Sequence, residues 1–181
     1  MFESVRRQEF REYFQPSRIS IAIIKSDKEN EYNLITLCFS MYCSYKPNMI
    51  SFSVQNTNYS YKLLDKVDHC VLAIPGEKLA EETLFCGDMS GKNVDKIRKC
   101  GFTLYKSSKI ETPSILEMKS NIELKIVNKI ITGDHLTVFG EVLSFNVNKK
   151  NVERNLVSVG KIHEGYEILA AKGIHRIATI R

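Results

Sequence analysis

Short apolar runs separated by polar turns dominate the chain, and most of them have the spacing of β-strands. Residues 18–25 are rich in β-branched side chains, and the polar stretch 26–30 that follows predicts a hairpin turn. An apolar run resumes from Glu31 to Phe39, and residues 48–54 alternate large and small side chains as a half-buried strand does. The first part of the chain is therefore predicted to be a meander of strands.

Helical spacing is confined to short stretches. Apolar residues at steps of three and four predict one helix after residue 58: Tyr59, Leu63, Leu64 and Val67. Asn58 or Thr57 is expected to cap this helix. Residues 78–85 predict a second helix that is broken at Gly87, and Asn93 is expected to cap a third.

The remaining runs favour strands again. A strand is predicted at 70–74, and two long β-rich runs at 122–127 and 136–142 flank the turn 132–135, which predicts an antiparallel hairpin. Beyond Asn148, short β-rich runs alternate with polar loops. Many strands with few, short helices predict a mainly β fold, an antiparallel, Greek-key-like barrel with helical insertions. A doubly wound parallel sheet would need a helix after nearly every strand.

Composition and charge bound the class of protein. The 181 residues, 43% of them hydrophobic, suffice for a single domain over 1–181 with its own core, and they exclude a disordered chain. The net charge is +5, with the positive residues scattered as singles and pairs, which suits anionic ligands. No apolar stretch approaches about 18 residues, and the N-terminus is charged where a signal peptide would be apolar. We expect a cytoplasmic protein with no membrane partner.

The cysteines and histidines predict neither a disulfide framework nor a metal site. The five cysteines contain no C-x-x-C pair, so reduced thiols are expected, and buried structural thiols are favoured over redox-active ones. They are Cys38, Cys43, Cys70, Cys86 and Cys100. His69, His163 and His175 lack metal-ligand spacing and are expected to be structural or surface residues. No Walker motif, nucleophile elbow or pair of catalytic carboxylates is present.

Two loops carry candidate binding chemistry. Segment 85–96 holds Ser90-Gly91-Lys92 between a helix end and a helix start, where backbone N–H groups and lysine charge suit a phosphate. The alternative is a solvated turn. In Gly133-Asp134-His135, the histidine stands at the entrance of an apolar strand, where its imidazole can bond a flavin or nicotinamide group. The alternative there is a turn histidine without partners. Polar and aromatic groups at 33–41 and 55–60 can hold a ring-containing cofactor.

Taken in chain order, these segments resemble the flavin reductase-like family of FMN-binding split β-barrels, and within it the flavoredoxin-type proteins. The resemblance covers roughly residues 14 to 147. Its most specific parts are Ser90-Gly91-Lys92 with Asp95-Lys96, and Gly133-Asp134-His135 about forty residues later. It implies a homodimer with one non-covalent FMN per subunit near the interface. NAD(P)H would be a transient co-substrate, because no G-x-G-x-x-G fingerprint accompanies the pattern.

The resemblance also assigns roles to single positions. Ser60 falls where a hydroxyl contacts the phosphate, Lys96 falls where a lysine neutralises it, and Ser90 lies in the same loop. Asn58 stands where Arg or Lys is common, so one positive charge is missing. The residues expected around the flavin ring or its ribityl chain are Asn33, Cys38, Phe39, Ser40, His135 and Tyr166. Among these, Cys38 replaces a common Ser, Phe39 replaces a common Trp, and His135 is the catalytic candidate.

The expected function is that of an NAD(P)H:flavin oxidoreductase, whose reduced FMN passes electrons to a small-molecule or protein acceptor. One alternative is a flavoredoxin-like FMN electron carrier without NAD(P)H activity of its own. Another is a basic barrel that binds nucleic acid. The scattered Lys and Arg residues form no stripe, so we expect no nucleic-acid partner.

Overall fold

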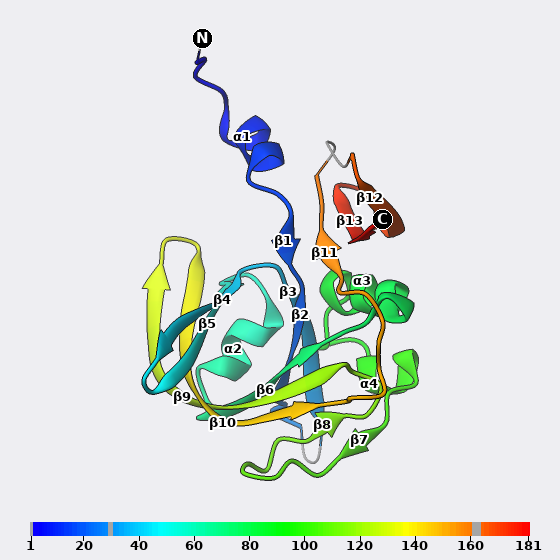
Figure 1. Cartoon of the computed structure of the whole chain (residues 1–181). Helices are drawn as coiled ribbons and strands as arrows, with labels where there is room; N and C mark the ends of the chain where they lie inside the picture. The colour runs from blue at the N-terminus through cyan, green and yellow to red at the C-terminus, as the bar shows by residue number, and fades with distance from the viewer. Residues whose placement is uncertain (1, 29–30, 161–163) are drawn as a thin grey trace.

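Seven antiparallel strands form the main sheet of the protein, which a computed structural model describes over residues 2–28, 31–160 and 164–181 (Figure 1). The strands pair in the order β3-β2-β6-β9-β10-β5-β4. They are β2 (Ser20–Lys25), β3 (Tyr32–Leu37), β4 (Ser40–Tyr45), β5 (Asn48–Gln55), β6 (His69–Ile74), β9 (Ser120–Thr132) and β10 (His135–Val147). Every pairing in this sheet is antiparallel, which confirms the predicted mainly β, antiparallel fold. His163 lies outside the described residues.

A smaller sheet and short helices complete the chain. The second sheet has the order β1-β11-β13-β12, with β1 (Ser17–Arg18), β11 (Val157–Ser158), β12 (Tyr166–Lys172) and β13 (His175–Ile180). Two further strands, β7 (Leu104–Tyr105) and β8 (Ser114–Ile115), pair with each other. The helices are α1 (Arg7–Tyr13), α2 (Tyr59–Leu64), the 3-10 helix η1 (Glu77–Leu79), α3 (Ala80–Asp88) and α4 (Lys96–Cys100). In the part of the chain that the structure describes, no helix has the length and apolar character to cross a membrane.

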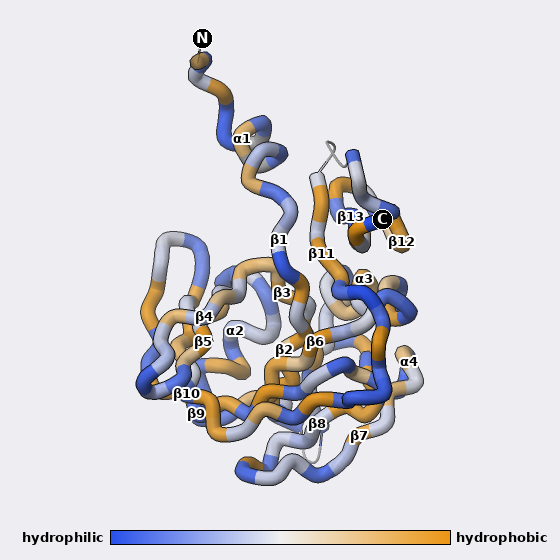
Figure 2. Tube along the Cα trace, in the orientation of Figure 1, coloured by the Kyte–Doolittle hydropathy of each residue, from blue (hydrophilic) through white to orange (hydrophobic). Residues whose placement is uncertain are grey.

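The central strands of the main sheet are buried on both faces, which explains their nearly continuous apolar sequences (Figure 2). Along β2, Ala22 and Ile24 face a core that also includes residues of β5, β9 and β10. The intervening Ile21 and Ile23 face the opposite way, into a second cluster that contains Cys86 of α3. Helix α3 is therefore held against the sheet by apolar packing, and it is placed to form one wall of a site.

The long hairpin β9–β10 follows the sequence prediction, because Gly133 has the left-handed backbone (φ 64°) that a two-residue hairpin loop needs. Other predictions need correction. Gly87 does not break its helix but lies within α3. Asp95, rather than Asn93, caps α4, since its carboxylate accepts a hydrogen bond from the Arg98 amide at 3.0 Å.

Candidate functional site

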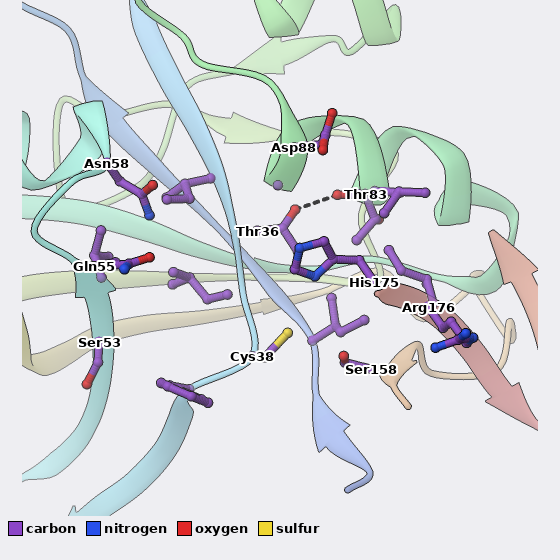
Figure 3. A pocket seen from close by; sticks show the side chains of 18 of the residues that line it. Thr36, Cys38, Ser53, Gln55, Asn58, Thr83, Asp88, Ser158, His175 and Arg176 are labelled. Atoms are coloured by element: carbon purple, nitrogen blue, oxygen red, sulfur yellow. Dashed lines mark hydrogen bonds between the residues drawn. The ribbon is translucent and has the colours of Figure 1, made fainter. Parts of the chain in front are cut away.

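The candidate site is a pocket of about 200 Å³ between the main sheet and the smaller sheet β1-β11-β13-β12 (Figure 3). Its walls come from β3 and the turn after it, β5, α3, the start of β10, and strands β11 and β13. Four of the predicted site residues line it: Cys38, Phe39, Asn58 and His135. The fold therefore brings together predicted residues from three separate segments of the chain.

His135 and Phe39 form an aromatic corner of this pocket. Their ring centroids are 5.5 Å apart and the ring planes are tilted by 38°. Nδ1 of His135 lies 2.7 Å from Oδ1 of Asp134, and this hydrogen bond holds the pKa of the Asp134 carboxyl below its ordinary value. An ionised carboxylate can only accept, so Nδ1 of His135 is the donor in this bond and Nε2 is the ring nitrogen left for a ligand. The corner offers one oriented imidazole beside an exposed aromatic face.

Helix α3 approaches β3 closely in another wall of the pocket. The Thr36 hydroxyl donates a hydrogen bond to the carbonyl of Thr83 at 2.6 Å, which joins the strand to the helix (Figure 3). A Cβ atom on Gly87 would lie 3.2 Å from Cβ of Thr36, so glycine permits this approach. Oγ1 of Thr83 is fully buried and has no hydrogen-bond partner, although Thr83 lines the pocket. A buried polar atom without a partner is uncommon in a protein, and a ligand or a water molecule at the pocket wall is one way to supply the missing hydrogen bond.

The smaller sheet supplies polar residues that the sequence analysis did not assign to the site. Ser158, His175 and Arg176 line the pocket, and Figure 3 shows Arg176 on the side away from Gln55 and Asn58. His175 is thus a surface residue, as expected, but it also belongs to the site. The sequence around His175 resembles that around His135. Each histidine is the first residue of a strand and follows a turn that contains a glycine, here Gly173 with a positive φ.

Asn33 and Ser60 are brought together by the fold, although neither lines the pocket. Both side chains are buried, and the Asn33 amide donates a hydrogen bond to the Ser60 hydroxyl at 2.7 Å. Oδ1 of Asn33 is buried without a partner, and a Cβ atom on Gly91 would lie only 1.8 Å from it. Strand β3, helix α2 and the loop after α3 therefore meet at one polar cluster, in which glycine is required by the close approach.

The structure places Lys96 differently from the sequence expectation. Its side chain is 4% exposed, and Nζ donates hydrogen bonds to the carbonyl oxygens of Leu34 at 2.6 Å and Cys86 at 2.7 Å. Burial lowers the pKa of this amine from its ordinary value. The ammonium that was expected to neutralise a phosphate is directed at backbone carbonyls of β3 and α3, so it joins these two elements.

We expect Lys96→Met to destabilise the fold rather than to abolish anion binding. The substitution leaves two carbonyl acceptors without this donor, which corresponds to about 2 kcal/mol of the free energy of unfolding. Lys92→Met is the matched control, since Lys92 is exposed and its loss should change stability by less than about 0.5 kcal/mol. Denaturant titration of both variants measures the difference. If Lys96→Met leaves the free energy of unfolding unchanged and weakens phosphate binding, Lys96 has the phosphate-binding role expected from the sequence.

The other predicted residues lie away from the pocket. Ser40 is within hydrogen-bond distance of Ser20, with their hydroxyl oxygens 3.2 Å apart, and it lines a different hollow beside β4. Ser90 accepts a hydrogen bond from the Lys92 amide at 3.4 Å within its own turn. Tyr166 begins β12, opposite Ile180. Within the described residues, no three His, Cys, Asp or Glu side chains are grouped so that they could hold a metal ion.

Comparison with known proteins identifies the family to which this chain belongs. Residues 19–165 match the family described as "Flavin reductase like domain". An uncharacterised protein of Archaeoglobus fulgidus is 29% identical over 132 residues, which cover 73% of each chain.

Solved structures of similar fold extend the likeness to nearly the full chain. A flavoredoxin of Methanosarcina acetivorans superposes with a TM-score of 0.78 at 16% identity, covering 88% of this chain and 87% of that one. An FMN-binding protein of Thermus thermophilus has the same TM-score and identity, with 99% and 98% covered. The NADH:FAD oxidoreductase SgcE6 of Streptomyces globisporus reaches 0.73 at 14% identity, with 87% and 91% covered. The predicted flavin reductase-like, flavoredoxin-type fold is confirmed, and the chain belongs to the flavin reductase like domain family.

Proposed function

We propose that the protein is an FMN-binding oxidoreductase, and that the pocket between α3 and the Phe39–His135 corner is its flavin site. The observation that carries this proposal is the meeting of an aromatic corner, neutral amides and one cation in a single pocket. Such a lining suits a ligand with a flat ring and an anionic tail. Family membership supports it, because the fold is shared with a protein named as FMN-binding and with one named as an NADH:FAD oxidoreductase.

The residues present fit the cofactor. Oγ1 of Thr83 is a buried polar atom without a partner in the pocket wall, which a polar ring edge would satisfy. Gln55 and Asn58 add neutral donors and acceptors, as expected for a polyhydroxylated chain. Arg176 is the cation among the lining residues, and the one carboxylate among the lining residues that the structure describes, that of Asp88, is paired with Lys172. We propose that Arg176, in place of Lys96, faces the phosphate.

A bound flavin supplies the redox chemistry, accepting a hydride from NAD(P)H and passing its electrons to an acceptor. The protein binds and orients the reactants. Phe39, which is 54% exposed, offers a face for stacking at the open side of the pocket. His135 is held by Asp134 in one tautomer, so it can orient a carbonyl or amide of the flavin or the nicotinamide without acting as a proton shuttle.

FMN titration tests the proposal. We expect one FMN per chain and weaker binding of riboflavin, because only FMN carries a phosphate for Arg176. Arg176→Gln should weaken FMN binding about tenfold, or about 1.4 kcal/mol, and leave riboflavin binding nearly unchanged. Arg154→Gln is the matched control, since Arg154 is held by Glu77 and Glu167 away from the pocket. Equal affinities of the parent chain for FMN and riboflavin would contradict the phosphate assignment.

A homodimer is proposed from the exposed edge of the main sheet. Strand β4 pairs only with β5 in this sheet, and it exposes Met41 by 64% and Tyr45 by 79%. An exposed apolar edge strand is a site of association. The pocket is lined by Cys38 and Phe39 just before this strand, so a second subunit bound along β4 would cover that end of it.

We therefore expect sedimentation to give about twice the 20.8 kDa of one chain. Tyr45→Lys should shift the protein towards the monomer because it places a charge on the edge strand. Ile174→Lys serves as the control, since Ile174 is 67% exposed in the β12–β13 turn. A parent mass near that of one chain with FMN bound would disprove the dimer.

A flavin electron carrier fed by a partner enzyme is the second candidate, and the structural likeness to a flavoredoxin favours it. Stopped-flow reduction of the FMN-loaded protein by NADH and NADPH separates the two. Reduction within the mixing time or over seconds supports the reductase. A lack of reduction by either nucleotide, with dithionite reducing the flavin normally, supports the carrier.

A further inference from the structure

Two cysteines outside the flavin pocket lie next to each other across the α3–α4 contact. Sγ of Cys86 and Sγ of Cys100 are 3.9 Å apart and are not bonded. Cys86 is fully buried on α3, whereas Cys100 is the last residue of α4 and is partly exposed. A disulfide requires about 2.0 Å between the sulfur atoms, so an approach of about 2 Å would suffice.

The two thiols differ in reactivity. A hydrogen bond between the two thiols is the main cause of the pKa shift of each. The bond from the Cys86 thiol lowers the pKa of Cys100, and the same bond, together with burial, raises the pKa of Cys86. The Lys96 ammonium nearby favours a thiolate on either sulfur, while Glu82 opposes it. The partly exposed Cys100 is thus the better nucleophile, and the buried Cys86 keeps its proton.

We propose that Cys86 and Cys100 form a redox-active dithiol that hydroperoxides oxidise to an intramolecular disulfide between α3 and α4. The Cys100 thiolate attacks one peroxide oxygen, so an S–O bond forms and the O–O bond breaks, giving a sulfenic acid and a hydroxide that takes up a proton. The Cys86 sulfur then attacks Sγ of Cys100. The S–S bond forms, the S–O bond breaks, and hydroxide leaves as water with the Cys86 proton.

This inference does not rest on the proposed flavin chemistry, but it bears on the same wall of the pocket. Helix α3 carries Thr83, Gly87 and Asp88 into the pocket and Cys86 towards α4. A disulfide would close the segment 86–100, which includes the loop that approaches Asn33 at Gly91. Oxidation is therefore expected to restrict this loop. Cys70, by contrast, matches the expectation of a buried structural thiol, since burial raises its pKa to about 12.

Peptide mapping of the full chain tests the proposal. The reduced protein is treated with one equivalent of hydrogen peroxide, alkylated under denaturing conditions and digested with trypsin. We expect the number of alkylated thiols to fall from five to three in the intact chain, and fragments 79–92 and 100–106 to be recovered as one disulfide-linked species. Dithiothreitol should restore all five. In the folded protein, trypsin cleavage after the exposed Lys92 should become several-fold slower on oxidation.

Variants separate this disulfide from other oxidation. Cys43→Ser removes an exposed thiol on β4 and should still give the linked species. Cys86→Ser and Cys100→Ser should each abolish it. Recovery of Cys100 as a sulfinic acid with Cys86 alkylated would overturn the proposal, and so would thiol loss only through a disulfide between two chains at Cys43. The map of the parent chain decides the question even if a buried variant does not fold.

Discussion

Gly87→Leu should lower the affinity of the protein for FMN by about 100-fold, which corresponds to about 2.7 kcal/mol. Gly87 lies in α3 and lines the pocket, and even a Cβ atom there would come within 3.2 Å of Thr36. Thr36 cannot easily retreat, because its hydroxyl is bonded to the Thr83 carbonyl. The remaining carbon atoms of a leucine side chain would therefore fill space that we assign to the cofactor. Equilibrium titration by flavin fluorescence measures the change.

Gly87→Ala is the matched control for this variant. A methyl group needs a shift of only a few tenths of an ångström, and alanine favours a helix over glycine by up to about 1 kcal/mol. We expect less than a tenfold loss of affinity for Ala, and the melting temperatures of both variants show whether the Leu variant keeps the fold of the parent. A Leu variant that binds FMN as tightly as the parent would place the flavin elsewhere, and the Asn33–Ser60 cluster would become the better candidate.

The sequence predicted those elements whose burial produces a regular pattern. Strand β2 is buried on both faces and reads as a continuous apolar run, and Gly133 marks the β9–β10 turn. Strand β4 was missed for the opposite reason. Its residues are exposed or half-buried throughout, so no alternation of apolar and polar positions distinguishes it from a loop. A strand at the edge of a sheet is formed by pairing with its neighbour, which a local pattern does not record.

The candidate site was predictable only in part, because sequence reasoning joins residues within a motif more easily than residues across the fold. Phe39 and His135 were expected at the flavin and do form one corner. Arg176 was not considered, since the resemblance ended near residue 147. Lys96 follows a Gly- and Ser-containing loop and so resembles a phosphate ligand, but its burial and its bonds to two carbonyls depend on how α4 packs on β3 and α3.

His135→Ala should slow the reduction of bound flavin by NAD(P)H about 10- to 100-fold, with each factor of ten corresponding to about 1.4 kcal/mol in the activation barrier. Hydride transfer depends on alignment of the two rings, and the imidazole beside Phe39 is oriented by its hydrogen bond to Asp134. FMN affinity should fall much less, since the other pocket residues remain. Stopped-flow absorbance at the flavin band measures the rate, and fluorescence titration measures the affinity.

The chain contains a matched control for this variant. His69 at the start of β6 has Nδ1 2.7 Å from the carboxylate of Asp68, the same arrangement as His135 with Asp134, but it is not part of the pocket lining. His69→Ala should therefore leave the rate of flavin reduction unchanged. Slowing by both variants would indicate a general loss of structure. If instead the flavin bound to the His135→Ala variant is reduced as fast as that bound to the parent, the imidazole does not align the reactants. An electron carrier that takes its electrons from a partner enzyme then becomes the better proposal for the function.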